Sequence, residues 1–264
     1  MMTSAVHLVT QCTVLLLVFA LPLLDAQPTP SGLTSDRRTI QTAAYEKGIG
    51  YVAGIRSTKD GVNFCAGALV GPSHVLTRTS CIVENIRWVS LGSTANSGAK
   101  DGEQIKVVAL LPHPNNSASH NDLLLLELDV ETTIAPVQLD AADSIVTPGM
   151  KGGRLGWNDT LAQAVQSRYL QSVEVEFVSN DQCGAELAVD ATILCSRGVS
   201  TAKSCMGDKG GAVVAKDKDQ DDDVLVGLVT QHKGCGKVGG TSVYTRIAPA
   251  RPWIDSIIKS YCVS

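Results

Sequence analysis

The chain has 264 residues, of which 44% are hydrophobic and 18% are charged, and its formal net charge is −4. This composition excludes intrinsic disorder, and the lack of a G-x-y repeat or a sustained heptad excludes collagen and coiled coil. The mild negative charge argues against nucleic-acid binding, which needs a basic face.

The first predicted element is an apolar run over residues 14–24. A membrane-spanning helix needs about 20 apolar residues, so this run is too short for membrane insertion. It fits the hydrophobic region of a secretory signal peptide covering residues 1–26, with Ala26 before the cut. The alternative is a buried terminal strand or helix, but the polar, Pro-containing stretch over residues 27–36 favours secretion.

From Ile49 onward the chain consists of short apolar runs separated by Gly, Pro, Asn and Asp. Val-rich runs of this length and spacing predict strands of a β-sandwich or barrel. Helical spacing of apolar residues occurs only over Pro249–Tyr261, which is predicted to be a helix. The predicted strand runs are Gly48–Ser57, Ala66–Thr77, Ile86–Gly92, Ile105–His113, Asp122–Asp129, Gly153–Trp157, Leu170–Val178, Gly211–Lys216, Asp223–Gln231 and Ser242–Ile247.

The chain has eight cysteines, of which Cys12 leaves with the signal peptide. No CxxC pair occurs, so we expect no metal site. In a secreted protein the other seven predict structural disulfides with one cysteine left over. The seven are Cys65, Cys81, Cys183, Cys195, Cys205, Cys235 and Cys262.

Three further segments carry local predictions. The acidic run over residues 216–223 is predicted to be a solvated hairpin loop, with an acidic metal or partner site as the alternative. The N-x-S/T sequons at Asn115 and Asn158 are candidate glycosylation sites in a secreted chain. Residues 137–153, with Pro148 and several glycines, are a candidate linker.

Four segments together resemble the trypsin-like (chymotrypsin-fold, peptidase family S1) serine proteases. The resemblance implies an all-β protein with two antiparallel six-stranded β-barrels and a C-terminal α-helix. It also implies the disulfides Cys65–Cys81, Cys183–Cys195 and Cys205–Cys235, leaving Cys262 free or intermolecular. The four segments are Asn63–Cys81, His120–Leu128, Lys203–Val214 and Val224–Gly236, the last followed by SVYTRI and PWI.

The resemblance also implies a domain organisation. A pro-like or linker segment over residues 27–38 would precede a domain over residues 39–264. Its first barrel would span about 45–140, its second about 150–248 and its helix about 249–262. Arg38-Thr39 lies where the family is cut, but Thr-Ile-Gln-Thr replaces Ile-Val-Gly-Gly, while Asp208, which receives the new amino terminus in the family, is kept.

The resemblance places Ser80 at the position of the catalytic His and Lys209 at that of the nucleophilic Ser, and keeps Asp122. A hydroxyl is no general base near neutral pH, and a protonated ammonium is no nucleophile. We therefore expect no peptidase activity of the family's kind and no cofactor. Because a buried carboxylate needs a partner, we expect a Lys209–Asp122 ion pair, bridged by Ser80. A Ser-Lys hydrolytic dyad is the alternative.

The positions that form the family's specificity pocket are altered as well. Lys203 lies where trypsins carry an Asp, His232 and Ser242 replace wall glycines, and Thr230-Gln231 replaces the usual Ser-Trp. Two interpretations remain open: relaxed constraint after loss of catalysis, and a repurposed binding surface. Neither requires a small-molecule substrate.

A narrower resemblance, over Gly54–Cys81 and Lys100–Val108, is to the glucanase inhibitor proteins secreted by oomycete plant pathogens. It implies binding to a host extracellular endo-β-1,3-glucanase in the plant apoplast, which blocks release of defence-eliciting glucan fragments. The alternatives are a secreted pseudoprotease with another partner, such as an adhesin or decoy, and an active hydrolase with unusual chemistry.

Overall fold

The computed structural model describes residues 49–117, 120–141, 143–158, 166–184, 189–198, 208–216, 222–232 and 241–260. The predicted signal peptide and the pro-like segment lie outside these residues. Within the described ranges, no helix is long and apolar enough to cross a membrane.

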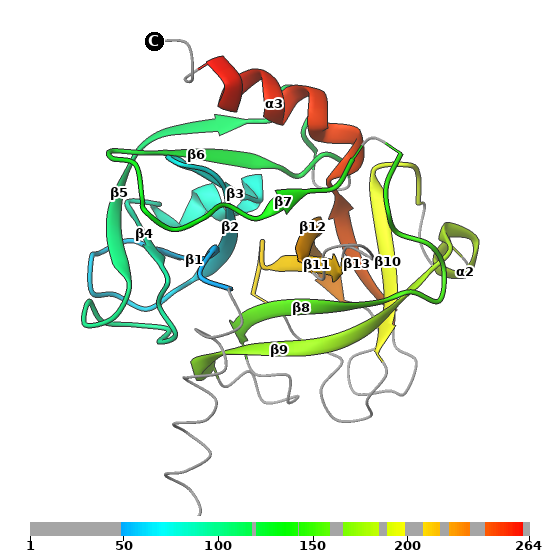
Figure 1. Ribbon diagram of the computed structural model, residues 1–264, viewed down its shortest axis with the longest axis horizontal. Coiled ribbons are helices and arrows are strands. Elements are labelled where there is room, and N and C mark those ends of the chain that lie inside the picture. Colours follow the sequence, from blue (N-terminus) through cyan, green and yellow to red (C-terminus); the bar gives the residue numbers. More distant parts are fainter. Residues whose placement is uncertain are drawn as a thin grey trace, which may run out of the picture.

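The first barrel is a closed sheet of six antiparallel strands (Figure 1), in the order β1-β2-β3-β6-β5-β4. Its interior is filled because β2 and β3 are buried at every position, as is most of β6. The predicted run Ala66–Thr77 divides into two strands at the Pro72-Ser73 turn. The strands are β1 (Val52–Arg56), β2 (Cys65–Gly71), β3 (His74–Thr77), β4 (Trp88–Leu91), β5 (Glu103–Pro112) and β6 (Leu124–Leu128).

The second barrel closes through the pairing of β11 with β12, and the short β7 joins its edge parallel to β12. The closure of both sheets confirms the predicted fold of two six-stranded barrels. Strand β7 lies within residues 137–153, the predicted linker. Lys216 and Asp223 face each other in the β11–β12 hairpin. The strands are β7 (Gln138–Leu139), β8 (Lys151–Asn158), β9 (Gln166–Val178), β10 (Ile193–Gly198), β11 (Ala212–Lys216), β12 (Asp223–His232) and β13 (Thr241–Arg246).

The predicted C-terminal helix is present as η2 (Ala248–Ala250) followed by α3 (Arg251–Ser260), which lies across the first barrel (Figure 1). The prediction that no other segment is helical is wrong, because η1 (Thr79–Glu84) and α2 (Asn180–Gly184) also form. Helix α2 begins with a capping box, in which Ser179 Oγ accepts from the Gln182 N–H and Gln182 Oε1 accepts from the Ser179 N–H. The local signal for α2 is therefore its capping box, whereas the prediction of helices relied on apolar periodicity.

Two disulfides are confirmed among the described residues, Cys65–Cys81 and Cys183–Cys195. The first ties β2 to η1, and the second ties α2 to β10. The expected Cys205–Cys235 bridge and Cys262 lie outside the described residues.

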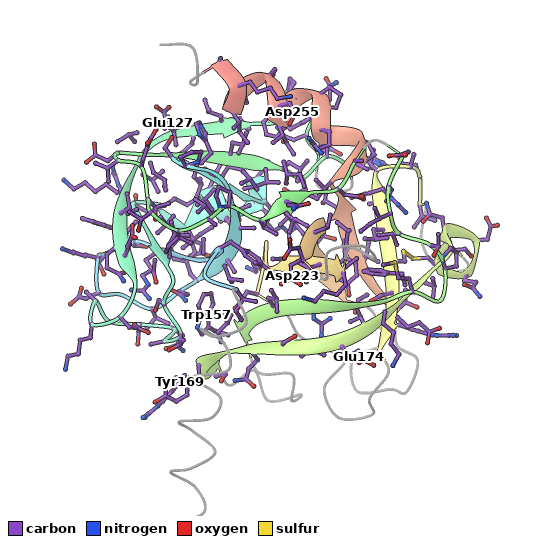
Figure 2. All side chains as sticks on the ribbon, in the orientation of Figure 1. Glu127, Trp157, Tyr169, Glu174, Asp223 and Asp255 are labelled. Carbon is purple, nitrogen blue, oxygen red and sulfur yellow. A yellow bond between two sulfur atoms is a disulfide. The ribbon has the colours of Figure 1, made fainter. Side chains whose placement is uncertain are left out.

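Buried apolar side chains from both barrels belong to one hydrophobic cluster, which includes Trp157 (labelled in Figure 2). Trp157, fully buried on β8, donates its indole N–H to the Thr94 carbonyl of the first barrel at 2.8 Å. The Tyr51 hydroxyl donates to Asp223 Oδ2 at 2.6 Å. Burial, followed by the charge of Asp223, raises the pKa of Tyr51 far above its ordinary value. The barrels are therefore joined by polar contacts as well as by apolar packing.

Candidate functional site

The three positions expected to correspond to a catalytic triad converge where the barrels meet. Ser80 lies in η1, Asp122 directly precedes β6, and Lys209 lies in the turn before β11. Asp122 Oδ1 accepts the backbone N–H of Ser80 at 3.2 Å. The Lys209 carbonyl accepts the N–H of Ala66 on β2 at 2.9 Å. The backbone thus brings these three positions together in one compact site.

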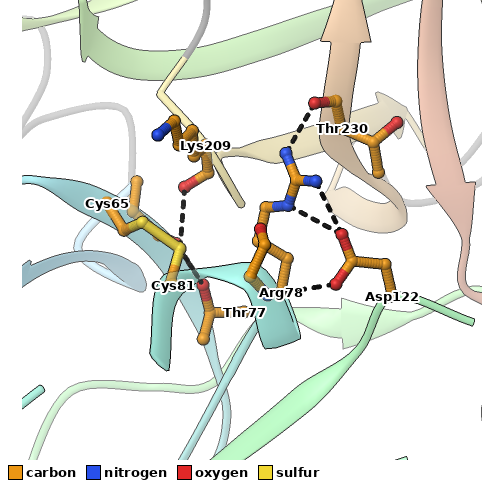
Figure 3. The surroundings of a disulfide bond; sticks show 9 residues. Cys65, Thr77, Arg78, Cys81, Asp122, Lys209 and Thr230 are labelled. Carbon is orange, nitrogen blue, oxygen red and sulfur yellow. Dashed lines mark hydrogen bonds and ion pairs between the residues drawn. A yellow bond between two sulfur atoms is a disulfide. The ribbon is translucent and has the colours of Figure 1, made fainter. Parts of the chain in front are cut away.

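A residue outside the expected triad occupies the centre of this site (Figure 3). Arg78 Nε and Nη2 lie 2.8 Å and 2.7 Å from Asp122 Oδ2, and its Nη1 donates to the Thr230 carbonyl at 2.5 Å. Both side chains are buried, with 9% and 5% of their surfaces exposed. One guanidinium therefore neutralises the buried carboxylate and connects the first barrel to β12 of the second.

The expected Lys209–Asp122 ion pair is wrong. Asp122 pairs with Arg78, whereas the Lys209 side chain is exposed and points away from the carboxylate (Figure 3). The reason is local geometry, because the main chain of Lys209 turns its carbonyl, rather than its side chain, toward β2 and η1. The sequence signal for Arg78 was a charged residue in the otherwise uncharged segment VLTRTSC, two positions before Ser80.

This arrangement limits the acid–base chemistry that the site can perform. A guanidinium stays protonated throughout the accessible pH range, so Arg78 accepts no proton. The Ser80 hydroxyl is exposed and makes no hydrogen bond to any residue described in the structure. Ser80 and Lys209 are therefore not connected as a nucleophile and its base would be.

The histidines whose side chains are described make their contacts away from Asp122. His113 packs edge-on against Trp253, with ring centroids 4.8 Å apart, and burial lowers the pKa of its imidazole. His120 pairs with Asp190 at 2.8 Å, and His74 is buried in β3 beside Ser73. Within the described residues, none of the three side chains contacts Asp122.

The expected pocket positions are only partly described. Thr230 Oγ1 donates to the Val243 carbonyl at 2.8 Å, and the buried Ser242 accepts from Arg154 Nη1 at 3.3 Å. Gln231 and His232 lie in β12, but their side chains, like all of Lys203, are outside the described residues. The buried Arg154 places a cation inside the second barrel, a feature the sequence patterns did not reveal.

A family model described as Trypsin matches residues 40–254 of the chain. The chain belongs to the trypsin family. It is 43% identical over 216 residues to glucanase inhibitor protein 3 of Phytophthora infestans, covering 79% of this chain and 83% of that protein. It is 37% identical over 217 residues to glucanase inhibitor protein 2 of Phytophthora sojae, covering 80% and 75%. Trypsin 5G1 of Aedes aegypti is 29% identical over 206 residues, covering 74% and 75%.

The resemblance implies that Asp208 receives the new amino terminus when a trypsin-family protein is activated. In this protein the Asp208 carboxylate accepts a hydrogen bond from within the chain. Asp208 is buried, and its Oδ2 accepts the backbone N–H of Trp157. A Cβ on Gly156 would lie 2.4 Å from that same oxygen, so a larger residue at this position would displace the Asp208 carboxylate. Arg38 and Thr39, the expected cleavage point, lie outside the described residues.

Of the candidate glycosylation sites, Asn115 is exposed on a turn after β5, whereas the side chain of Asn158 at the end of β8 is not described. Glycosylation of both remains a prediction. Among the described residues, no cluster of three or more His, Cys, Asp or Glu side chains is arranged to hold a metal ion.

Proposed function

We propose that this protein is a secreted, proteolytically inactive trypsin homologue that binds and inhibits an endo-β-1,3-glucanase of a host plant. Several similar proteins are named glucanase inhibitor proteins. In this proposal the protein acts in the plant apoplast and slows the release of glucan fragments that elicit defence.

The observation that carries the proposal is the Arg78–Asp122 ion pair. In a working triad the aspartate orients an imidazole that accepts the proton of the nucleophile. Here Asp122 Oδ2 is occupied by a guanidinium, which accepts no proton. Lys209, at the nucleophile position, presents an exposed side chain, so inactivity follows from the absence of both a base and an attacking group.

The Thr230 carbonyl supports the same conclusion. The resemblance implies that an extended peptide docks along the strand where Thr230-Gln231 replaces the usual Ser-Trp, and we expect that docking strand to be lost here. In this protein the Thr230 carbonyl already accepts a hydrogen bond from Arg78. A peptide substrate would have to displace a charge-assisted hydrogen bond, so the scaffold is better suited to binding a folded protein surface.

Inhibition of glucan hydrolysis tests the proposal directly. The purified secreted protein would be titrated against a plant endo-β-1,3-glucanase, with release of reducing sugar from laminarin as the signal. We expect dose-dependent inhibition at micromolar concentrations or below. Full glucanase activity at micromolar excess would refute the inhibitor function and favour a different extracellular partner.

A second experiment tests inactivity by reconstruction. We expect an active-site serine probe to leave the wild-type protein unlabelled, whereas labelling of Ser80 would establish a hydrolase. The double variant Ser80→His/Lys209→Ser should also remain unlabelled, because Arg78 still occupies Asp122. Adding Arg78→Ala to that variant should permit labelling at residue 209, and equal labelling of both variants would contradict the role assigned to Arg78.

A further inference from the structure

A histidine of the first barrel contacts a carboxylate of the second barrel. His120 lies between β5 and β6, two residues before Asp122, and Asp190 lies between α2 and β10. The Nδ1 atom of His120 is 2.8 Å from Oδ2 of Asp190. This contact joins two loops that only the packing of the barrels brings together.

The turn that carries His120 is fixed by its own hydrogen bonds. The Ser117 N–H donates to the His120 carbonyl at 2.8 Å, and Ser117 Oγ accepts the His120 N–H at 3.0 Å. At Asn121 the backbone adopts a left-handed φ of 49°, which turns the chain sharply between His120 and Asp122. The two side chains therefore reach different partners although they are close in sequence.

The Asp190 carboxylate is anchored in the second barrel. Its Oδ1 accepts the Thr192 N–H at 2.8 Å and the Thr192 hydroxyl at 2.6 Å, and its backbone carbonyl accepts Nδ2 of Asn180 on α2 at 2.8 Å. The other carboxylate oxygen, Oδ2, is the one that faces His120. Hydrogen bonds from Thr192 and, to a smaller extent, the contact with His120 lower the pKa of Asp190, so this carboxylate is ionised in mildly acidic medium.

Among the described residues, Asp190 is the only charged side chain that contacts His120. On the loop of His120, His113 packs against an aromatic ring, and Asp122 is neutralised by a guanidinium. On α2, the exposed Asp181 forms no ion pair within the part of the chain that the structure describes. The charge of His120 therefore depends on the pH of the solution and on one carboxylate.

We propose that His120 and Asp190 form a pH-dependent latch between the two barrels, closed when His120 is protonated and open when it is neutral. An imidazole changes charge between about pH 5 and 8, and only the protonated form gives a charge-assisted contact with a carboxylate. As the pH rises through this range, the ion pair is lost. Below about pH 4 the carboxylate takes up a proton and the ion pair is lost again, so the latch is strongest near about pH 5.

The strength of the latch follows from its exposure. The two side chains are 42% and 49% exposed, although the Nδ1 atom of His120 is itself shielded from solvent. Ion pairs in such positions change an equilibrium constant by about twofold to fivefold. A bias of this size changes how often the two loops separate, without unfolding either barrel. A binding surface that spans both barrels would therefore be better ordered in mildly acidic medium.

Hydrogen exchange of the full-length secreted protein, followed by mass spectrometry, tests the latch. The reporters are peptides that contain residues 117–121 and residues 190–192. We expect their protection factors, which correct for the intrinsic effect of pH on exchange, to be about twofold to fivefold higher at pH 5.5 than at pH 8. His120→Gln and Asp190→Asn should each abolish this difference, and combining them should have no further effect, because both remove the same contact.

Two matched variants control for the loss of a histidine and of a carboxylate. His113→Gln removes a histidine of the same loop whose ring contacts Trp253, and Asp181→Asn removes a carboxylate of the neighbouring helix α2. Both should keep the wild-type pH difference, with thermal unfolding to verify that every variant folds. Equal protection of the wild type at the two pH values would overturn the inference. So would a pH difference that persists in His120→Gln, or one that either control variant abolishes.

Discussion

Arg78→Met is the most informative single perturbation of the site, because it removes the charge that neutralises a buried carboxylate. The side chains of Arg78 and Asp122 are 9% and 5% exposed, so water cannot solvate the remaining anion fully. Breaking a buried pair by removing one partner costs about 3–5 kcal/mol. For a domain of this size that corresponds to a decrease in melting temperature of about 6–20 °C.

Urea unfolding at neutral pH, followed by tryptophan fluorescence, measures this free energy. The double variant Arg78→Met/Asp122→Asn should recover at least half of the loss, because no charge is then left buried. Arg197→Met is the matched control, since that arginine pairs with Glu176 but is 50% exposed, and the loss should stay below about 1 kcal/mol. A loss below about 1 kcal/mol for Arg78→Met itself would refute the reasoning.

Three further predictions concern the fold. Replacing Cys65 and Cys81 by serine should lower the free energy of unfolding by about 3 kcal/mol, because the bridge, with a sequence separation of 16, restricts the unfolded chain; an unchanged urea midpoint would contradict this. Tyr51→Phe should lose less stability at alkaline pH than wild type. The folded-state pKa of Tyr51 is raised, so the contribution of Tyr51 to stability is full below about pH 10 and is lost as the pH rises. Unfolding free energies at pH 7 and 11 would measure the difference. Asp101→Asn should flatten the loss of stability in acid. Although burial raises the pKa of Asp101, hydrogen bonds from neighbouring groups lower it overall, so its stabilisation is present above about pH 4 and is lost as the pH falls. Wild-type acid sensitivity in that variant would be the contrary result.

The patterns that led to correct predictions are short-range ones. Val-rich runs such as Asp223–Gln231 predicted strands because a short continuous apolar run between turn residues favours a strand that is buried along its length. The stripe over Pro249–Tyr261 predicted a helix for the same kind of reason, since its period matches the helical turn. Helix α2 was missed because five residues are too few to show a period, although its capping signal was present in the sequence.

The contents of the site depended on longer distances. The prediction pairs Asp122 with Lys209, because a long side chain can reach a buried carboxylate. The actual contacts join residues 44 and 152 positions apart, Arg78 to Asp122 and Arg78 to Thr230. No local pattern encodes which of two nearby cations points inward.

The sequence by itself therefore determined the family fold and, through the resemblance to trypsin-like proteases, two of the disulfides, because both follow from residue identities at matching positions along the chain. Only the tertiary structure decided which side chain neutralises Asp122. Neutralising a buried carboxylate depends on which side chain the packed backbone directs toward it, and the barrels direct Arg78 inward and leave Lys209 in solvent.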